Sequence, residues 1–471
     1  MSAPATTEKK YLKWYQKLAY GSGDLASNCS YGLVSSFVLL YLTGTLGLDS
    51  AIIGSLMLAS KVLDGISDVI FGTLIDRTHS KLGKARPWML FGQVGVSLCL
   101  FLLFAIPAGS TTMQYIYFFI VYTALNAVFY TANGIAYSSL VALITKNNNE
   151  RVQLGSFRFM FAVVTNIFMG FAVTGMVEKF GSGAAGWRTT ALIFAIVGLV
   201  VNTISCLAVK ELPEEELSGN TSEAAEEGKA VAEEKKHGFA ETAKILVHNK
   251  YYLMILAIYI VYYIMSNLTT GAGVFCATYY WGDGSLLGQF SMMKMFPVII
   301  ALAIAPVLIK KTGSMQKVNF WGYAISSVLG IPMIYFAMQK NISMFLLFMF
   351  IKGIFAGTLS GSLNALIAEA SGYTTRTTGV HMDGMMYSCS SLGVKVGGGI
   401  GTAAVGWLLK LGGFVGTATV QSESAIKMIF NLYITFPFIL GIVITVLLAF
   451  LDVEKANKKW DADHVQKEAQ V

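Results

Sequence analysis

Long apolar runs alternate with short polar segments along the whole chain, rather than clustering at one end. Each run reaches or exceeds the roughly 20 residues that an α-helix needs to cross the hydrocarbon core of a bilayer. The pattern predicts twelve membrane-spanning helices, and because several runs exceed the minimum length we expect those helices to tilt or bend. The predicted spans are residues 25–47, 50–75, 88–107, 113–144, 157–178, 187–209, 251–281, 285–309, 318–338, 341–369, 381–409 and 424–451.

The composition supports an all-α integral membrane protein. Of the 471 residues, 55% are hydrophobic and only 13% are charged, and the mean hydropathy is +0.60. These values are far from those of a soluble domain. The net charge of +7 would suggest acidic partners in a soluble protein. Here the basic residues fall mainly in loops, where they meet anionic lipid headgroups, so we expect membrane lipid and no nucleic acid as a partner.

The basic residues also predict how the chain crosses the membrane. Lys and Arg gather in the N-terminal segment, the second and eighth loops and the C-terminal tail, whereas the first, third and seventh loops contain neither. Because cytoplasmic loops carry the excess of Lys and Arg, both termini are predicted to be cytoplasmic. The opening residues MSAPATTEKK lack the apolar core of a cleavable signal peptide, so insertion is expected to depend on the spans themselves.

A polar segment separates two groups of six spans. Residues 211–236 read ELPEEELSGNTSEAAEEGKAVAEEKK, with too few apolar side chains to form a core. Related heptapeptides, LIDRTHS and LIKKTGS, follow the second and eighth spans, as in transporters built from an internal repeat. The sequence therefore predicts an N-terminal six-helix bundle at 1–210, a cytoplasmic linker at 211–250, a C-terminal six-helix bundle at 251–452 and a cytoplasmic tail at 453–471.

One apolar run contains a cluster of charges. In SKVLDGISDVIFG, Lys61, Asp64 and Asp68 are spaced so that all three project from one face of a helix. Charged side chains in a membrane usually face the bundle interior, so this face is predicted to point inward. One cation cannot neutralise two anions, so one carboxylate is left to bind a coupling ion. That ion is either Na⁺, held by oxygen ligands, or a proton, held by an Asp whose affinity for the proton is raised by burial and by the second Asp. The alternative is a Lys–Asp pair that only helps two helices to pack. The eighth span has Val298 and Leu302 at the matching places, so coupling is predicted in the N-terminal half alone.

Other classes of site find no support in the sequence. The cysteines show no CxxC or paired spacing and are expected to be small buried residues, at Cys29, Cys99, Cys206, Cys276 and Cys389. Clustered His or Cys ligands, a phosphate-binding glycine loop beside a strand and a nucleophile motif are also missing. We therefore expect neither an enzyme nor a bound cofactor.

Four motifs carry a resemblance to a known family. YGSGDLASN, LDGISDVIFGTLIDRTHSKLGKARPW, GSFRFMF and MDGMMYSCSSLGVKVGGG resemble the glycoside–pentoside–hexuronide:cation symporters, which include the melibiose carrier and belong to the major facilitator superfamily. The resemblance covers essentially the whole chain. It implies the major facilitator fold of two six-helix bundles and transport by alternating access. It also implies sugar uptake driven by Na⁺, Li⁺ or H⁺ across the bacterial cytoplasmic (inner) membrane. The protein is expected to be a monomer.

The resemblance also assigns roles to residues. Asp64 and Asp68 match the cation-site carboxylates, with Lys61 as their internal counter-charge, and would be the metal ligands if Na⁺ is the coupling ion. Arg158 matches a sugar-binding arginine, which suits bidentate hydrogen bonding, although a charge reaching toward the cytoplasmic surface is the alternative. Lys395 matches a lysine that contacts the coupling region. It lies among glycines at four-residue spacing, which would let a neighbouring helix approach closely, at Gly393, Gly397 and Gly401.

The chain departs from the melibiose carrier at the sugar site. That carrier holds its sugar with aspartates in the first and fourth helices, where this chain has Asn28 and Gly134. The neighbouring Asn133 and Tyr137 are therefore candidate sugar ligands, together with residues of the C-terminal half, Asn364 and Ser391. A galactoside is not required. Fewer anions around a retained Arg158 and Lys395 favour a substrate with a negative group such as a hexuronide, and family members that take neutral pentosides are the alternative, because they can share this pattern. The alternative function is a major-facilitator carrier of a non-sugar substrate such as a lysolipid or another amphiphile.

Charge partners or gate residues complete the prediction. Asp24, at the start of the first span, could cap the helix, pair with a gate residue or line the pathway, and a structural role is favoured. Towards the cytoplasmic end of the tenth span, AEASGYTTRTTGVHMDG contains gate candidates at Arg376, His381 and Asp383. His381 is interpreted as a polar gate residue rather than a proton relay.

Overall fold

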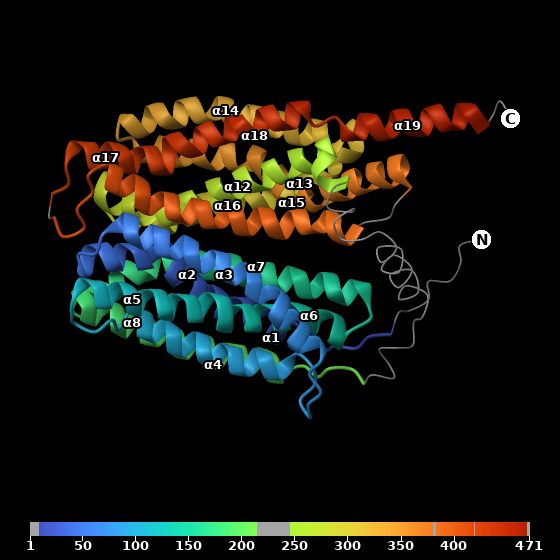
Figure 1. Cartoon of the computed structure of the whole chain (residues 1–471). Helices are drawn as coiled ribbons and strands as arrows, with labels where there is room; N and C mark the ends of the chain where they lie inside the picture. The colour runs from blue at the N-terminus through green and yellow to red at the C-terminus, as the bar shows by residue number, and fades with distance from the viewer. Residues whose placement is uncertain (1–8, 214–244, 380–382, 419, 469–471) are drawn as a thin grey trace. The chain divides into compact units, whose positions relative to one another are not determined.

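The structure is a computed structural model that describes residues 9–213, 245–379, 383–418 and 420–468. These residues form helices and connecting loops, and no strand occurs among them (Figure 1). The first half contains α1 (Trp14–Gly21), α2 (Gly23–Leu40), α3 (Ser50–Asp76), α4 (Arg86–Leu103), α5 (Thr111–Thr123), α6 (Thr131–Ile144), α7 (Asn148–Lys179) and α8 (Gly183–Leu207). The second half contains α12 (Lys250–Phe275), α13 (Leu286–Thr312), α14 (Met315–Met338), α15 (Ile342–Thr378), α16 (Asp383–Leu411), α17 (Glu423–Phe430), α18 (Phe436–Phe450) and α19 (Val453–Glu468).

The predicted spans are helical, and the all-α membrane fold is confirmed. In the part of the chain that is described, eleven helical runs are long and apolar enough to cross a bilayer. The remaining predicted span, the second at residues 50–75, is α3, which is long enough at 27 residues but carries four charged side chains, at Lys61, Asp64, Asp68 and Asp76. The helical run of the first span begins earlier than predicted, at Trp14, and the tenth continues to Thr378. Polar residues at these ends extend the helices beyond the apolar runs.

Four π-helical segments interrupt the α-helices, at η1 (Tyr41–Thr45), η2 (Ala124–Tyr130), η3 (Cys276–Trp281) and η4 (Asn431–Thr435). A π-turn widens the helix and shifts its hydrogen-bond ladder, and such turns are frequent at functional sites. Of the four, η2 joins α5 to α6 and packs against α3, the helix with the charge cluster.

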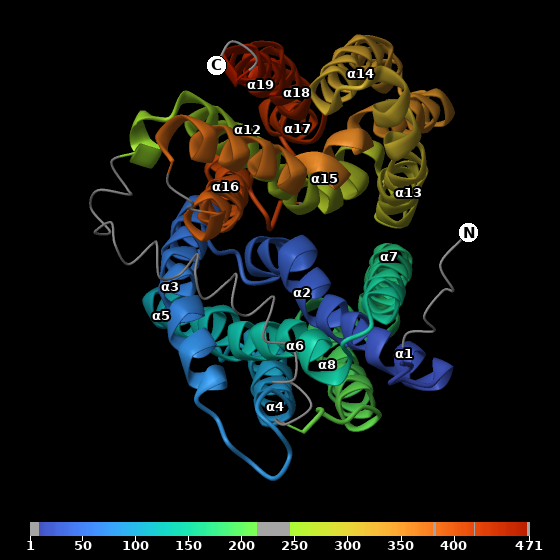
Figure 2. The same ribbon diagram turned by 90° about the vertical axis from the view of Figure 1, so that its right-hand side faces the viewer.

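The helices group into two compact units. One comprises Met1–Gly219, Gly273–Gln289 and Gly406–Ile426, and the other Asn220–Ala272, Phe290–Val405 and Lys427–Val471. In the first unit α4 packs against α6 and α8, and α2 packs against α7 and α8 (Figure 2). Gly92 of α4 makes such packing possible, because a Cβ there would lie 3.0 Å from the Asn133 backbone nitrogen of α6. The division at a linker of residues 211–250 stays a prediction.

In the second unit, α14 packs against α15 and α18, and α15 packs against α19. The glycine face predicted for α16 is confirmed as a contact with α12. A Cβ at Gly397 would lie 2.5 Å from the Ile260 carbonyl oxygen, and one at Gly401 would lie 2.7 Å from that of Ile264. Any larger side chain would force the two helices apart, so these glycines set the spacing between α12 and α16.

A shared capping device supports the internal repeat. Glu211, just after α8, accepts hydrogen bonds from the backbone N–H groups that open α4, at distances of 2.7 to 3.1 Å. Glu454, in the first turn of α19 just after α18, accepts equivalent bonds from Met315 and Gln316 at the start of α14, at 2.8 and 3.0 Å. A carboxylate is favourable there because it meets unpaired N–H groups and the positive end of the helix dipole.

The five cysteines are all buried with free thiols, as the sequence predicts for small buried residues.

Candidate functional site

The charge cluster of α3 turns towards protein. Lys61 and Asp64 have side chains that are only 18% and 14% exposed, whereas apolar residues on the opposite positions, such as Ile66 and Val69, are mostly exposed. The Lys61 ammonium nitrogen lies 3.5 Å from Asp64 Oδ2. Asp68, one turn beyond Asp64 on the same helix, is partly buried. The helix thus presents its apolar face outward, as expected next to lipid, and its carboxylates inward.

Asp64 also meets oxygen groups from a second helix. The Thr131 hydroxyl, at the start of α6, lies 2.7 Å from Asp64 Oδ1 and 2.9 Å from the Asn126 carbonyl oxygen of η2. Since the hydroxyl has one proton, it can donate to only one of these oxygens at a time. Carboxylate, hydroxyl and carbonyl oxygens are the ligands that hard cations prefer. The arrangement can therefore hold a small cation or a proton.

An aromatic pair borders the charge cluster. Tyr31 of α2 stacks on Tyr130 of η2 with ring centroids 5.5 Å apart, and the Lys61 ammonium lies 5.9 Å from the Tyr31 ring. The ring face attracts the cation and adds to the ion pair with Asp64. Lys61 is thus fixed by two partners from different helices, which keeps its charge beside the carboxylate.

A second charge pair links α2 to α7. Arg158 Nε lies 2.6 Å from Asp24 Oδ2, and the two side chains are 26% and 17% exposed. The guanidinium also stacks 4.2 Å from the centre of the Tyr137 ring. These contacts hold Arg158 in place, rather than leaving it to extend towards the membrane surface.

Polar groups continue along α2 and α7 beyond this pair. Asn28 donates from Nδ2 to the Asp24 carbonyl oxygen at 2.7 Å, and its Oδ1 accepts from Asn166 Nδ2 at 2.9 Å. Asp24 and Asn28 are one turn apart on α2, and Arg158 and Asn166 are two turns apart on α7. The two helices therefore carry a row of hydrogen-bonding groups that can exchange partners with sugar hydroxyls.

Two of the predicted sugar ligands are deeply buried. Asn133 donates from Nδ2 to the Met89 carbonyl oxygen at 2.8 Å and so serves the packing of α6 on α4. Tyr137 donates its hydroxyl to the Tyr20 carbonyl oxygen at 2.8 Å, while Tyr20 donates back to the Tyr137 carbonyl oxygen at 2.6 Å. The Tyr137 ring supports Arg158 in this structure, and its hydroxyl is used by the backbone of α1.

The predicted residues of the second half lie on α15 and α16. Asn364 of α15 accepts from the Tyr259 hydroxyl at 2.8 Å, Ser391 of α16 is exposed, and Lys395 is partly buried. Arg376, in the last turn of α15, pairs with Asp461 of α19 at 3.0 Å. Two gate candidates have no described side chain, since Asp383 opens α16 and His381 lies outside the described residues.

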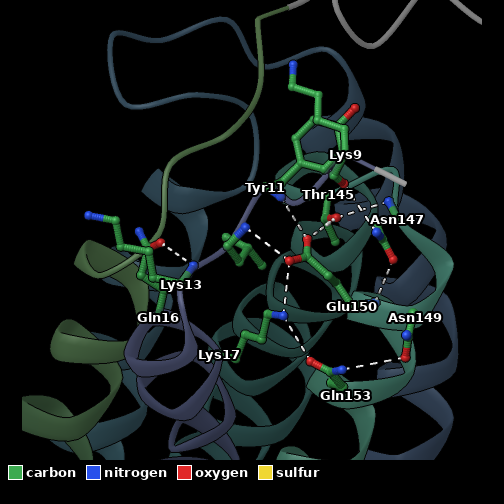
Figure 3. A network of polar contacts seen from close by, with 11 residues as sticks. Lys9, Tyr11, Lys13, Gln16, Lys17, Thr145, Asn147, Asn149, Glu150 and Gln153 are labelled. Carbon is green, nitrogen blue, oxygen red and sulfur yellow. Dashed lines mark hydrogen bonds and ion pairs between the residues drawn. The ribbon is translucent and has the colours of Figure 1, made fainter. Parts of the chain in front are cut away.

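A buried network anchors the start of α7, the helix that carries Arg158 (Figure 3). Glu150, which is 2% exposed, pairs with Lys17 of α1 at 3.0 Å. Its carboxylate also accepts from two backbone N–H groups of the segment before α1 and from a hydroxyl before α7, those of Tyr11, Leu12 and Thr145. The network ties the N-terminal segment and α1 to α7, and so helps to set where Arg158 meets Asp24.

The sequence patterns did not identify several of these groups. Thr131 and Asn166 are uncharged polar residues in helices that carry other such residues, and no local spacing distinguishes them. Glu150 lies in the first turn of α7, where Asn147 caps the helix by accepting from the Glu150 N–H at 3.0 Å. That position is readable from the sequence, but the burial of the Glu150 side chain depends on its contact with Lys17 of α1. These contacts arise only when distant helices pack together.

Comparisons with known sequences and structures find relatives over most of the chain. A sequence model of the family described as "MFS/sugar transport protein" matches residues 19–455. The chain is 26% identical to the isoprimeverose transporter of Lactiplantibacillus pentosus, over all of this chain and 96% of the relative. It is 24% identical to a putative glycoside/cation symporter of Escherichia coli, over 95% and 93% of the two chains. The crystal structure of a D-xylose-proton symporter superimposes with a TM-score of 0.62 at 12% identity, covering 92% of this chain and 97% of that one.

Proposed function

The chain belongs to the MFS/sugar transport protein family, and on this basis we propose that it is a secondary active transporter that couples a cation to the symport of a sugar by alternating access. The sugar is a glycoside, a pentoside or a hexuronide. The relatives named above are transporters of isoprimeverose and, putatively, of a glycoside with a cation. The family also agrees with the expectation that the chain is a transporter and not an enzyme.

One observation carries the proposal: an ionisable pair inside a membrane helix that meets oxygen ligands from another helix. Asp64 has Lys61 on one side and Thr131 on the other. Burying such charges is expensive, and in membrane proteins they mark ion pathways. A coupling ion at Asp64, with Asp68 one turn away, would compete with Lys61 for the carboxylate and so change how α3 packs on α6.

The coupling ion is Na⁺, Li⁺ or H⁺, and no other cofactor is proposed. The Asp64, Thr131 and Asn126 oxygens suit a metal cation, since all three are hard ligands. A proton would instead bind a carboxylate whose neighbour disfavours a second negative charge. A Na⁺ site and a proton site would use the same residues, so uptake measured with separate Na⁺ and pH gradients must distinguish them.

The sugar is proposed to bind along the row formed by α2 and α7. Arg158 and Asp24 offer a donor and an acceptor 2.6 Å apart, a spacing that adjacent sugar hydroxyls can bridge. Asn28 and Asn166 extend the row by a pair of amides. From the second half we propose Lys395, Ser391 and Asn364 as further contacts, and Arg376, His381 and Asp383 as gate residues.

The protein is proposed to lie in the bacterial cytoplasmic membrane as a monomer, with both termini in the cytoplasm. The Lys and Arg of the N-terminal segment and of the loops after α3 and α13 support this orientation. The alternative of a carrier for a lysolipid or another amphiphile is not favoured, because the polar pairs of α2 and α7 suit a polyol better than a lipid chain.

Uptake into proteoliposomes tests the proposal. Purified protein is given a panel of labelled glycosides, pentosides and uronides, with a Na⁺ gradient and a pH gradient imposed separately. We expect one gradient to drive accumulation of at least one sugar above its equilibrium level, and an ionophore that collapses that gradient to abolish it. Gradient-independent equilibration of every sugar, or no uptake at all, would contradict cation-coupled sugar symport.

A further inference from the structure

The second unit contains a cavity of about 190 Å³ inside its own helices. By the same measure one water molecule needs roughly 10–15 Å³, so the space is large enough for a polar ligand group with its water. Residues of α12, α13, α14, α15, η4 and α18 line it. All of its lining residues belong to this unit.

Two lysines from different helices line this cavity. Lys294 lies on α13 and Lys352 on α15, and both are partly buried. The Lys294 ammonium nitrogen is 3.1 Å from the Thr270 hydroxyl oxygen. Lys352 has no hydrogen-bond or ion-pair partner among the described residues. An ammonium group offers three donors, so both lysines have donors to spare.

No carboxylate lies among the described lining residues to balance these two charges. The carboxylate of α15, Glu369, is nine residues beyond the last lining residue of that helix, Ser360, and accepts a hydrogen bond from Asn457 of α19. The stretches 251–282, 284–368 and 424–451 contain neither Asp nor Glu. In the first unit, by contrast, two cations within the helices have a carboxylate partner: Lys61 pairs with Asp64, and Arg158 pairs with Asp24. An unpaired charge in an apolar interior is costly, so a group that brings a negative charge would be bound favourably.

The rest of the lining fits a sugar. Hydroxyl groups come from several helices, and the Tyr262 and Ser360 hydroxyl oxygens lie 2.8 Å apart. Apolar side chains such as Met293, Phe345 and Phe438 also line the cavity. Sugars present hydroxyls at their edges and C–H groups on their faces, so a pocket with both kinds of lining suits them. Further hydroxyl groups of the lining come from α12 and α14, at Ser266, Thr269, Ser326 and Ser327.

We propose that this cavity binds an anionic sugar of the hexuronide class, with Lys294 and Lys352 on its carboxylate and the hydroxyls of the lining on its ring. The assignment rests on the proposed function as a sugar transporter and narrows its substrate. Two ammonium groups from different helices can hold the two oxygens of one carboxylate, and these charge-assisted bonds are about twice as strong as neutral ones.

A matched pair of ligands tests the assignment. Methyl β-D-glucuronide and methyl β-D-glucoside differ in the carboxylate that replaces a hydroxymethyl group. Their binding is measured by calorimetry on the full chain in nanodiscs of phosphatidylcholine, which has no net charge. We expect the glucuronide to bind at least tenfold more tightly than the glucoside, because each charged hydrogen bond contributes on the order of a tenfold change in Kd.

Variants connect the preference to the two lysines. Lys294→Gln and Lys352→Gln are each expected to weaken glucuronide binding about tenfold while glucoside binding changes less than twofold. Unchanged glucoside binding also reports that the variant is folded. Lys317→Gln, at an exposed lysine of α14 outside the cavity lining, is the matched control and should leave both affinities unchanged.

Several results would overturn the assignment. Equal affinity of the unaltered chain for both glycosides, binding of neither, or an equal loss of both in the lysine variants would each do so. A glucuronide preference that is abolished in nanodiscs containing phosphatidylglycerol would assign the cavity to lipid headgroups instead. The proposed function fails separately, when no sugar of the panel accumulates under any cation gradient.

Discussion

Arg158 of α7 and Asp24 of α2 form an ion pair with Nε and Oδ2 only 2.6 Å apart, although 134 residues separate them in the chain. The guanidinium is held from a second side by the Tyr137 ring. Neither side chain is fully buried, so each has donors or acceptors to offer to a ligand. The pair is therefore a preformed donor and acceptor set for adjacent hydroxyl groups.

Replacing Arg158 should weaken sugar binding much more than cation binding. For Arg158→Ala we expect at least a tenfold rise in the sugar Kd, because charged hydrogen bonds contribute roughly 1.5–3 kcal/mol each. Calorimetry with the sugar identified by the uptake panel measures this, and cation binding to the same variant is the internal reference. Arg151→Ala, about two turns earlier on α7, is a control outside the pair. Unaltered sugar affinity in Arg158→Ala would remove the pair from the binding site.

Replacing Asp64 should have the opposite effect. Asp64→Asn keeps the shape of the side chain and removes the charge, so gradient-driven accumulation should be lost while sugar exchange across the membrane persists in part. Asp68→Asn is expected to behave in the same way. Counterflow in proteoliposomes measures the exchange, and Thr73→Ala, an exposed position on the same helix, is the matched control. Loss of sugar binding with intact cation movement would show that the carboxylates belong to the sugar site.

The variant Thr131→Val should distinguish Na⁺ coupling from proton coupling. The substitution removes the hydroxyl that lies 2.7 Å from Asp64 while keeping a side chain of similar shape. If Na⁺ is the coupling ion, its half-saturating concentration should rise at least fivefold, because one ligand is lost. If a proton is the coupling ion, the pH dependence of uptake should move while Na⁺ continues to have no effect. Unchanged cation dependence in both assays would exclude Thr131 from the coupling site.

Periodicity was sufficient to predict the membrane helices and the inward face of α3, because both are local properties of the chain. The glycine face of α16 was predictable for the same reason, because Gly393, Gly397 and Gly401 lie at four-residue spacing within one helix. The partners of the charged residues were not. The Thr131 hydroxyl lies 67 residues from Asp64 in sequence, and only the packing of α6 on α3 brings the two together.

The two lysines of the cavity were missed in the sequence for a different reason. Lys294 and Lys352 lie in apolar spans, as Lys61 does, and the rule that singles out ionisable residues in membrane helices applies to all three. Lys61 stood out because two aspartates share its helix face. Each of the other two has no charged residue within two turns of it on its helix, and the two come together only when α13 and α15 place them along one cavity.

The two capping carboxylates should contribute similarly to stability. Glu211 and Glu454 each accept hydrogen bonds from backbone N–H groups at the start of a helix. Glu211→Ala and Glu454→Ala should each lower the free energy of unfolding by about 1–3 kcal/mol, as expected when such donors lose their acceptor. Thermal unfolding in detergent measures this, and Glu178→Ala, at an exposed position near the end of α7, is the control. A large loss in one variant and none in the other would argue against equivalent roles in the two halves.

The ion pair at the start of α3 predicts a dependence on pH. Asp49 caps this helix by accepting from the Ala51 N–H, and its Oδ2 lies 2.6 Å from the Lys410 ammonium nitrogen. Burial favours the neutral carboxyl, but the Lys410 hydrogen bond and those from the helix N-terminus outweigh it and lower the pKa of Asp49.

A lowered pKa in the folded state means that Asp49 stabilises the protein above the ordinary pKa of an aspartate, and that this stabilisation is lost as the pH falls through the lower folded value. Asp49→Asn should therefore be less stable than the unaltered chain at pH 6, and the difference should shrink as the pH approaches 3. Because Lys410 is mostly exposed, the difference should be small and should decrease in high salt. Thermal unfolding of both proteins between pH 6 and pH 3 checks this, and a difference that grows on acidification would contradict the sign.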